Sequence, residues 1–228
     1  MTIDISKIQA ICFDVDGTLR DTDDQYVARV ESFMRPFHWL FRNRKTVTFS
    51  RWLVMRFEGP VNGIFSLADK LGLDGPLHRL IELANPWKGR GKESGYLLVP
   101  GVTETLEVLA SQFPLAVITA RGERSTRNFL ESTGLNVYFA YVASALTSPR
   151  GKPQPDPILW AAEQMNVAPE NCLMVGDTSV DIQAGKAAGA QTIAVLSGFG
   201  EEQELRDIGA DLLIASVANL PDIFGFTK

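Results

Sequence analysis

Six short apolar segments, often β-branched and bounded by Gly, Pro or polar residues, recur along the chain and predict strands. They span residues 10–13, 115–118, 141–143, 172–175, 192–196 and 212–214. Continuous apolar runs of this length are typical of strands that are buried on both faces of a sheet. We therefore expect these segments to form the sheet of a buried core.

Helical periodicity appears between the strands from about residue 98 onward. Residues 103–112, 124–131 and 157–165 place apolar side chains on one face, and Gly134 is a suitable stop for the second of these helices. A further helix is expected over 182–188. Strand–helix alternation favours an α/β fold class in which helices cover a parallel sheet.

Residues 23–92 interrupt this alternation with apolar positions at helical spacing and no strand pattern. We expect a helical insertion there, with residues 1–22 and 93–228 forming the core domain. Within the insertion, residues 32–57 combine six Arg or Lys side chains with seven Phe or Trp side chains and contain no acidic residue. The preferred interpretation is a small helical domain with solvated basic side chains. Steering of anionic substrates and contact with a membrane surface or a partner are the alternatives.

Composition narrows the class of protein without naming a function. The chain has 228 residues, a formal net charge of −5 and a sequence pI near 5.1, which gives no reason to expect nucleic-acid binding. The two cysteines, Cys12 and Cys172, lie in apolar runs and are expected to be buried thiols. No signal peptide and no apolar run of bilayer length is recognised, so a cytoplasmic location is expected.

Polar residues that are suited to catalysis or ligand binding follow the predicted strands. Asp14 and Asp16 follow the first strand, Thr119 ends the second, Asp177 follows the fourth, and Lys152 lies beyond the third. Ligands of parallel sheets bind at the carboxyl ends of the strands, so these groups should meet at one edge. Carboxylates brought together repel one another unless a cation compensates, and oxygen ligands without His or Cys favour Mg²⁺.

Four segments, in this order, resemble the motifs of the haloacid dehalogenase-like hydrolase superfamily. They are Asp14-Val15-Asp16-Gly17-Thr18-Leu19, Val117-Ile118-Thr119, Lys152 within Gly151-Lys152-Pro153, and Gly176-Asp177-Thr178-Ser179-Val180-Asp181. The resemblance implies a Rossmann-like core with a helical cap, residues 23–92, inserted after the first strand. Its nearest likeness is to the branch of phosphoglycolate phosphatase and β-phosphoglucomutase.

The resemblance also implies a role for each matched residue. Asp14 would be the nucleophile and a metal ligand, and Asp16 the general acid and base with its backbone carbonyl on the metal. Lys152 would neutralise charge, and Thr119 with the backbone N–H of Ala120 would hold the phosphoryl oxygens. Asp177 would bind Mg²⁺. Asp181 would support the metal or orient Lys152, with helix capping as the alternative.

Arg121 and Thr119 each have a second interpretation. Arg121 would contact substrate or serve as a structural arginine, and Thr119 could also cap the following helix.

The implied function is Mg²⁺-dependent hydrolysis of a small phosphate monoester through an aspartyl-phosphate. Dehalogenase members of the superfamily lack an acid at the position of Asp16, so its presence favours phosphoryl transfer. The core motifs do not separate a phosphatase from a β-phosphoglucomutase-like phosphotransferase or a pyrophosphatase. A catalytically silent binding protein on the same fold is the alternative from another class. The expected partner is a small phosphorylated metabolite, and the sequence does not specify an oligomeric state.

Overall fold

A computed structural model describes residues 3–21 and 96–226 of the chain. The predicted cap, residues 23–92 with its basic and aromatic segment 32–57, lies outside the described residues. The division into two domains therefore stays a prediction.

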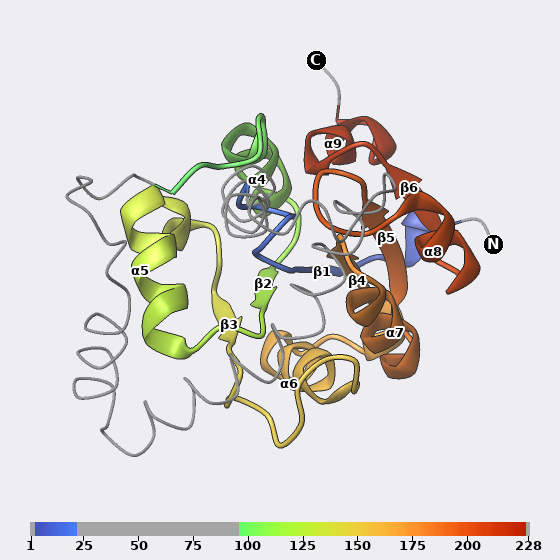
Figure 1. Cartoon of the computed structure of the whole chain (residues 1–228), viewed down its shortest axis with the longest axis horizontal. Coiled ribbons are helices and arrows are strands. Elements are labelled where there is room, and N and C mark those ends of the chain that lie inside the picture. Colours follow the sequence, from blue (N-terminus) through green and yellow to red (C-terminus); the bar gives the residue numbers. More distant parts are fainter. Residues whose placement is uncertain (1–2, 22–95, 227–228) are drawn as a thin grey trace, which may run out of the picture.

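A six-stranded parallel sheet forms the centre of the described part (Figure 1), with strand order β3-β2-β1-β4-β5-β6. The strands are β1 (Ala10–Phe13), β2 (Leu115–Ile118), β3 (Tyr141–Ala143), β4 (Cys172–Gly176), β5 (Gln191–Val195) and β6 (Leu212–Ile214). The predicted strands are confirmed to within one residue at either end, and so is the α/β fold class. Because β1 lies between β2 and β4, the chain reverses its direction of travel across the sheet at β1, where ligand sites of such sheets form.

Helices cover both faces of the sheet. The α-helices are α4 (Val102–Ala110), α5 (Glu123–Thr133), α6 (Asp156–Met165), α7 (Ser179–Ala188), α8 (Glu202–Asp207) and α9 (Leu220–Ile223). Short 3₁₀ turns are η1 (Ile5–Lys7), η3 (Leu135–Val137), η4 (Pro169–Asn171) and η5 (Val217–Asn219). In Figure 1, α4 and α9 lie on one side of the sheet and α6 and α7 on the other.

Alternation along β1 shows how the two faces are filled. Ile11 and Phe13 belong to the apolar cluster under α4, α5 and α9, whereas Ala10 and Cys12 belong to the cluster under α6 and α7. Successive side chains of a strand point to opposite faces, so a strand buried on both sides must be apolar throughout. Cys12 and Cys172 are both free and buried, as predicted.

Helix boundaries differ from the sequence expectations at several points. The helix expected from residue 182 begins at Ser179, and the one expected to reach residue 112 ends at Ala110. Gly134 does stop α5, with a left-handed φ of 73°. The sequence did not indicate α8 or α9. Each is short, and α8 buries only Leu205, so neither shows an apolar repeat.

No helix within residues 3–21 and 96–226 is long and apolar enough to cross a membrane.

Candidate active site

Three neighbouring strands end in polar residues at one edge of the sheet. Asp14 follows β1, Thr119 follows β2 and Asp177 follows β4, and all three side chains are buried. The strand order β2-β1-β4 sets these positions side by side. The predicted convergence of residues far apart in the sequence is therefore present in the structure.

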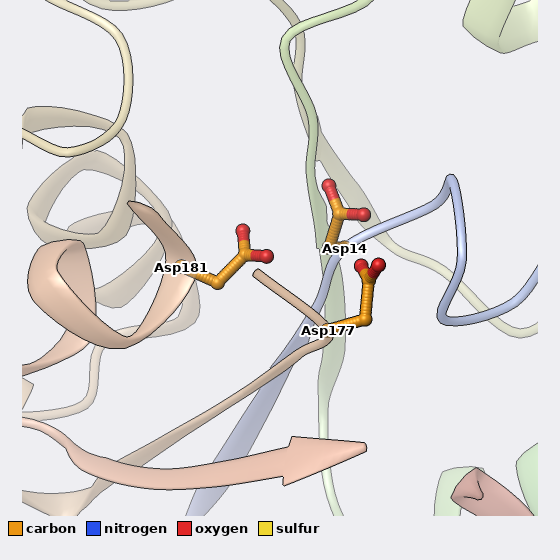
Figure 2. Close-up of side chains that lie close together, drawn as sticks. All are labelled: Asp14, Asp177 and Asp181. Carbon is orange, nitrogen blue, oxygen red and sulfur yellow. The ribbon is translucent and has the colours of Figure 1, made fainter. Parts of the chain in front are cut away.

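Asp14, Asp177 and Asp181 form a group of buried carboxylates, in which one oxygen from each lies within 4.8 Å of the others. Figure 2 shows Asp14 and Asp177 projecting from adjacent strand ends while Asp181 points toward them from α7. The group contains the two acids whose side chains were expected on the metal, Asp14 and Asp177, and the acid expected to support it, Asp181; the side chain of Asp16 is not part of it. A set of three clustered carboxylate oxygens has the ligand chemistry of a hard divalent cation.

Lys152 joins two members of this group. Its Nζ donates to Oδ1 of Asp14 at 2.5 Å, to Oδ1 of Asp181 at 2.6 Å and to the carbonyl oxygen of Ile118 at 3.0 Å. The lysine side chain is only 5% exposed, so all three ammonium protons are used inside the protein. Charge-assisted bonds of this kind are the strong ones in a low-dielectric site.

Burial raises the pKa of Asp14 to about 8, because desolvation and the nearby Asp181 and Asp16 outweigh the attraction of Lys152. Desolvation also raises the pKa of Asp177, with further contributions from Asp14 and Asp181. Burial alone would lower the pKa of Lys152, but its two carboxylate partners raise it. The three carboxyl groups of Asp14, Asp177 and Asp181 thus have only one nearby ammonium group, that of Lys152, to balance their negative charge.

Asp177 is held by neutral donors on both of its oxygens. Thr18 Oγ1 donates to Oδ1 at 3.2 Å, and the backbone N–H of Phe199 donates to Oδ2 at 2.8 Å. The loop after β5 is itself tied to the loop after β1, because Ser197 Oγ donates to the carbonyl oxygen of Gly17 at 2.9 Å. These bonds orient Asp177 without neutralising it.

Gly198 allows this loop to approach Asp177. A Cβ atom at residue 198 would lie 2.0 Å from Asp177 Oδ2, whereas one at Gly151 would meet nothing within 4 Å. Substitution of Gly198 by Ala should displace Asp177 or the loop and lower the free energy of unfolding by about 1–3 kcal/mol. The matched change at Gly151 should alter it by no more than about 0.5 kcal/mol. Chemical denaturation of both variants provides the measurement, and equal stability of the two would contradict the close approach.

Asp16 is turned toward two arginines. Arg20 Nη1 donates to its Oδ1 at 3.1 Å, and Arg121 Nε lies 3.5 Å from its Oδ2. The side chain remains 16% exposed, more than that of any carboxylate in the buried group. Of the two interpretations of Arg121, the structure shows a contact with another protein side chain.

Thr119 is buried at the end of β2, where its N–H donates to the carbonyl oxygen of Ala143 at 2.9 Å. Its Oγ1 accepts from the N–H of Arg121 at 3.2 Å. The interpretation of Thr119 as a helix cap is wrong, because α5 begins at Glu123 with Gly122 as its N-cap residue. Ala120 lies in the loop between β2 and α5, at the expected edge of the sheet.

Asp181 serves both of the roles that the sequence left open. Its Oδ2 accepts from the N–H of Thr178 at 3.0 Å and from Thr178 Oγ1 at 2.6 Å, which forms a capping box at the start of α7. Its Oδ1 binds Lys152. The capping box at the start of α7 therefore fixes the Asp181 carboxylate, which in turn orients Lys152.

Several residues of the site were not identified from the sequence, namely Thr18, Arg20, Tyr96, Ser197 and the backbone N–H of Phe199. Thr18 lies inside a recognised motif, and Ser197-Gly198-Phe199-Gly200 follows a strand end, which was an available signal. The contacts of Arg20 and Tyr96 join the two ends of the long insertion, so no local pattern indicates them.

Comparison with known proteins agrees with this geometry. The family model described as haloacid dehalogenase-like hydrolase matches residues 11–195. A pyrophosphatase, PpaX of Oceanobacillus iheyensis, is 27% identical over 96% of this chain and 98% of its own length. Phosphoglycolate phosphatase of Escherichia coli is 28% identical over 96% of this chain and 93% of its own length.

A solved structure shows the same fold. It is a haloacid dehalogenase family hydrolase from Deinococcus radiodurans with bound phosphate and sodium, with a TM-score of 0.69, 23% identity and coverage of 97% of this chain and 98% of that one. The family model spans most of the chain, from the second residue of β1 to the last residue of β5, and includes every residue of the carboxylate and lysine group. The chain is therefore an enzyme of the haloacid dehalogenase-like hydrolase family, in the branch of phosphoglycolate phosphatase-like proteins.

Proposed function

We propose that this protein is a Mg²⁺-dependent phosphohydrolase that forms an aspartyl-phosphate on Asp14 while cleaving a small phosphate monoester. The observation that supports this most is the position of Lys152, which bonds to Asp14 and Asp181 beside the third buried carboxylate, Asp177. A lysine beside an aspartate nucleophile reduces the repulsion between that carboxylate and an incoming phosphoryl group.

The residues present fit a divalent cation. When all three are ionised, the buried carboxylates leave two negative charges against one ammonium, and an all-oxygen ligand set suits Mg²⁺. Asp14 and Asp177 would hold the ion with the backbone carbonyl of Asp16, and Asp181 would support it. When bound, the cation would draw charge from the phosphoryl oxygens and help to fix their orientation.

In the first step a carboxylate oxygen of Asp14 forms a bond to phosphorus as the bond between phosphorus and the leaving oxygen breaks. Asp16 gives its proton to that leaving oxygen. Thr119 Oγ1 and the N–H of Ala120, at the end of β2, would bind the phosphoryl oxygens. Lys152 enters this step protonated, since its carboxylate partners raise its pKa.

In the second step Asp16 takes a proton from water, and the resulting hydroxide oxygen attacks phosphorus. The bond to Asp14 breaks, inorganic phosphate leaves and the carboxylate is regenerated. Asp16 ends the cycle carrying the proton that the next substrate requires, so atoms and protons balance over the two steps.

Two similar proteins, a phosphoglycolate phosphatase and a pyrophosphatase, suggest the substrate class. We propose a small phosphate monoester as the first candidate and inorganic pyrophosphate as the second. A mutase that transfers the phosphoryl group between sugar hydroxyls uses the same core residues and would release little free phosphate.

The test is a phosphate-release screen over phosphoglycolate, sugar phosphates, pyrophosphate and p-nitrophenyl phosphate, with Mg²⁺ and then with a chelator. We expect release only with the metal, and a mass increase of one phosphoryl group on Asp14 after rapid acid quenching. A lack of release across the whole panel would contradict the proposal, and conversion between sugar phosphates without release would identify a mutase.

Metal binding should also release a proton. The pKa of about 8 means that Asp14 of the metal-free protein carries a proton at pH 7, and Mg²⁺ must displace it. Because burial also raises the pKa of Asp177, the second proposed ligand, we expect release of about one to two protons per ion at pH 7 and tighter apparent binding as the pH rises. Calorimetric titration in two buffers of different ionisation enthalpy measures this. The Asp14→Asn variant should release fewer protons than the native protein, because only Asp177 then loses one, and an absence of release from the native protein at pH 7 would contradict the assignment.

A further inference from the structure

We propose that Arg20 and Arg121 are positioning residues that hold the Asp16 carboxylate in place for proton transfer. This rests on the acid and base role proposed for Asp16. Each arginine faces a different carboxylate oxygen: Arg20 donates a hydrogen bond to Oδ1, and Arg121 forms an ion pair with Oδ2 at 3.5 Å. A carboxylate held at both oxygens by groups from different parts of the chain cannot rotate freely about its side-chain bonds.

Arg20 is anchored where the chain enters and leaves the segment 22–95. It forms an antiparallel bridge with Leu98, and next to it the N–H of Asp21 donates to the carbonyl oxygen of Leu97 at 3.0 Å. Its guanidinium carbon lies 5.0 Å from the centre of the Tyr96 ring. Backbone pairing and cation–π contact thus fix both ends of this side chain.

Arg121 is anchored independently, in the loop after β2. Its N–H donates to Thr119 Oγ1 at 3.2 Å, and its carbonyl oxygen accepts from the N–H of Ala145 at 2.9 Å. Its guanidinium carbon lies 5.9 Å from the Tyr96 ring and 5.7 Å from the Phe129 ring, and these rings pack edge to face at 5.3 Å. The aromatic pair therefore supports both arginines.

Burial strengthens this arrangement. The side chains of Arg20 and Arg121 are each 13% exposed and that of Asp16 is 16% exposed, so solvent screens these ion pairs less than it screens pairs on the open surface. Proton transfer to a leaving oxygen requires the donor within hydrogen-bond reach, and small displacements reduce the rate. Two fixed cations give Asp16, the most exposed carboxylate of the site, a defined position.

The diagnostic experiment is the Arg20→Met variant assayed with two leaving groups. Cleavage of an alkyl phosphate needs the proton from Asp16, whereas p-nitrophenolate leaves readily without one. We expect kcat/KM for the alkyl phosphate to fall by about 10- to 100-fold and that for p-nitrophenyl phosphate by less than about 3-fold. The Arg20→Lys variant, which keeps a cation, should recover most of the alkyl phosphate activity. Arg20 is a better probe than Arg121, because Arg121 directly follows the proposed phosphate-binding loop.

The matched control is Arg127→Met, since Arg127 is exposed and pairs with Glu123 on the surface of α5. It should change neither rate by more than about 2-fold. If Arg20→Met lowers both rates equally, leaves both unchanged, or raises the alkyl phosphate rate because the arginine only favoured the ionised form of Asp16, the positioning role is wrong. Should this variant fail to fold, Arg20→Gln replaces it with the same expected split between leaving groups.

Asp16→Asn separates a failure of this proposal from a failure of the proposed function. A strong leaving-group dependence in Asp16→Asn without one in Arg20→Met would overturn the positioning role alone. No dependence in Asp16→Asn would overturn the acid role on which both depend. Adding Arg20→Met to Asp16→Asn should cause no further loss of alkyl phosphate activity, because the arginine would then have no proton donor to position.

Discussion

Replacement of Asp14 by asparagine should lower phosphate release by roughly 10⁴-fold or more while leaving the protein folded. Asparagine has nearly the same shape, and its side-chain oxygen can still accept a hydrogen bond from Lys152. Its neutral amide, however, is too weak a nucleophile to form the bond to phosphorus that the first step needs. Phosphate release with Mg²⁺ and circular dichroism of the same sample are the two measurements. The control is Asp207→Asn on the exposed surface of α8, which should retain native activity.

The stability of this variant should depend on pH in a defined direction. The pKa of Asp14 is raised from 3.8 to about 8 in the folded protein, so folding becomes less favourable as the pH rises through that interval. Asparagine does not titrate. In the metal-free state, the melting temperature of the variant relative to the native protein should therefore rise between pH 5 and pH 9. Near-native turnover by the variant would remove the covalent mechanism.

Replacement of Lys152 by methionine should cause the largest loss of stability in the site. It would leave Asp14 and Asp181 facing one another, both buried and without their cation. Removal of one partner of a buried ion pair typically lowers the free energy of unfolding by about 3–5 kcal/mol. Activity should fall by at least about 100-fold, since the attacking carboxylate loses its shield from the phosphoryl charge.

Denaturant unfolding at pH 5 and pH 8 tests this expectation. The loss of unfolding free energy should be smaller at pH 5 than at pH 8, because the unpaired carboxylates of Asp14 and Asp181 in the folded variant can take up protons. Lys186→Met is the matched control, since Lys186 Nζ lies 3.8 Å from Asp211 Oδ1 and the lysine side chain is 36% exposed. This variant should lower the free energy of unfolding by only about 0–1 kcal/mol. Addition of Asp181→Asn to Lys152→Met should restore part of the stability. A Lys152→Met protein as stable as the control would show that the lysine does not balance these carboxylates.

The strands and most helices could be predicted because their signals are local. Ile11, Cys12 and Phe13 are all buried, and a strand covered on both faces needs an unbroken apolar run that the sequence displays directly. Gly134 marked the end of α5 because a left-handed residue favours glycine there. α7 starts three residues before the expected position, because Asp181 lies within its first turn, where it forms a capping box with Thr178, and not ahead of the helix.

The residues of the candidate site could be proposed from the sequence, but only some of their contacts could. Asp14, Thr119 and Asp177 follow strands of one parallel sheet, so their meeting at one edge follows from topology. Asp181 lies beside Asp14 and Asp177, whereas the contact of the Asp16 side chain with two arginines was not expected from the sequence. Gly17 lies between β1 and Arg20 with a left-handed φ of 86°, and the resulting turn allows Arg20 to return to Asp16.

The sequence by itself determined the α/β class, the order of the motifs and the family, because these depend on local apolar patterns and on short segments of fixed composition. Tertiary structure alone decided that Lys152 also bonds to the carbonyl oxygen of Ile118, that Asp177 is oriented by Phe199 and that Asp16 lies between two arginines. The physical reason is that these contacts join residues from separate loops. Their geometry is set by how helices and strands pack around the sheet, and no local pattern in the chain encodes that distance or direction.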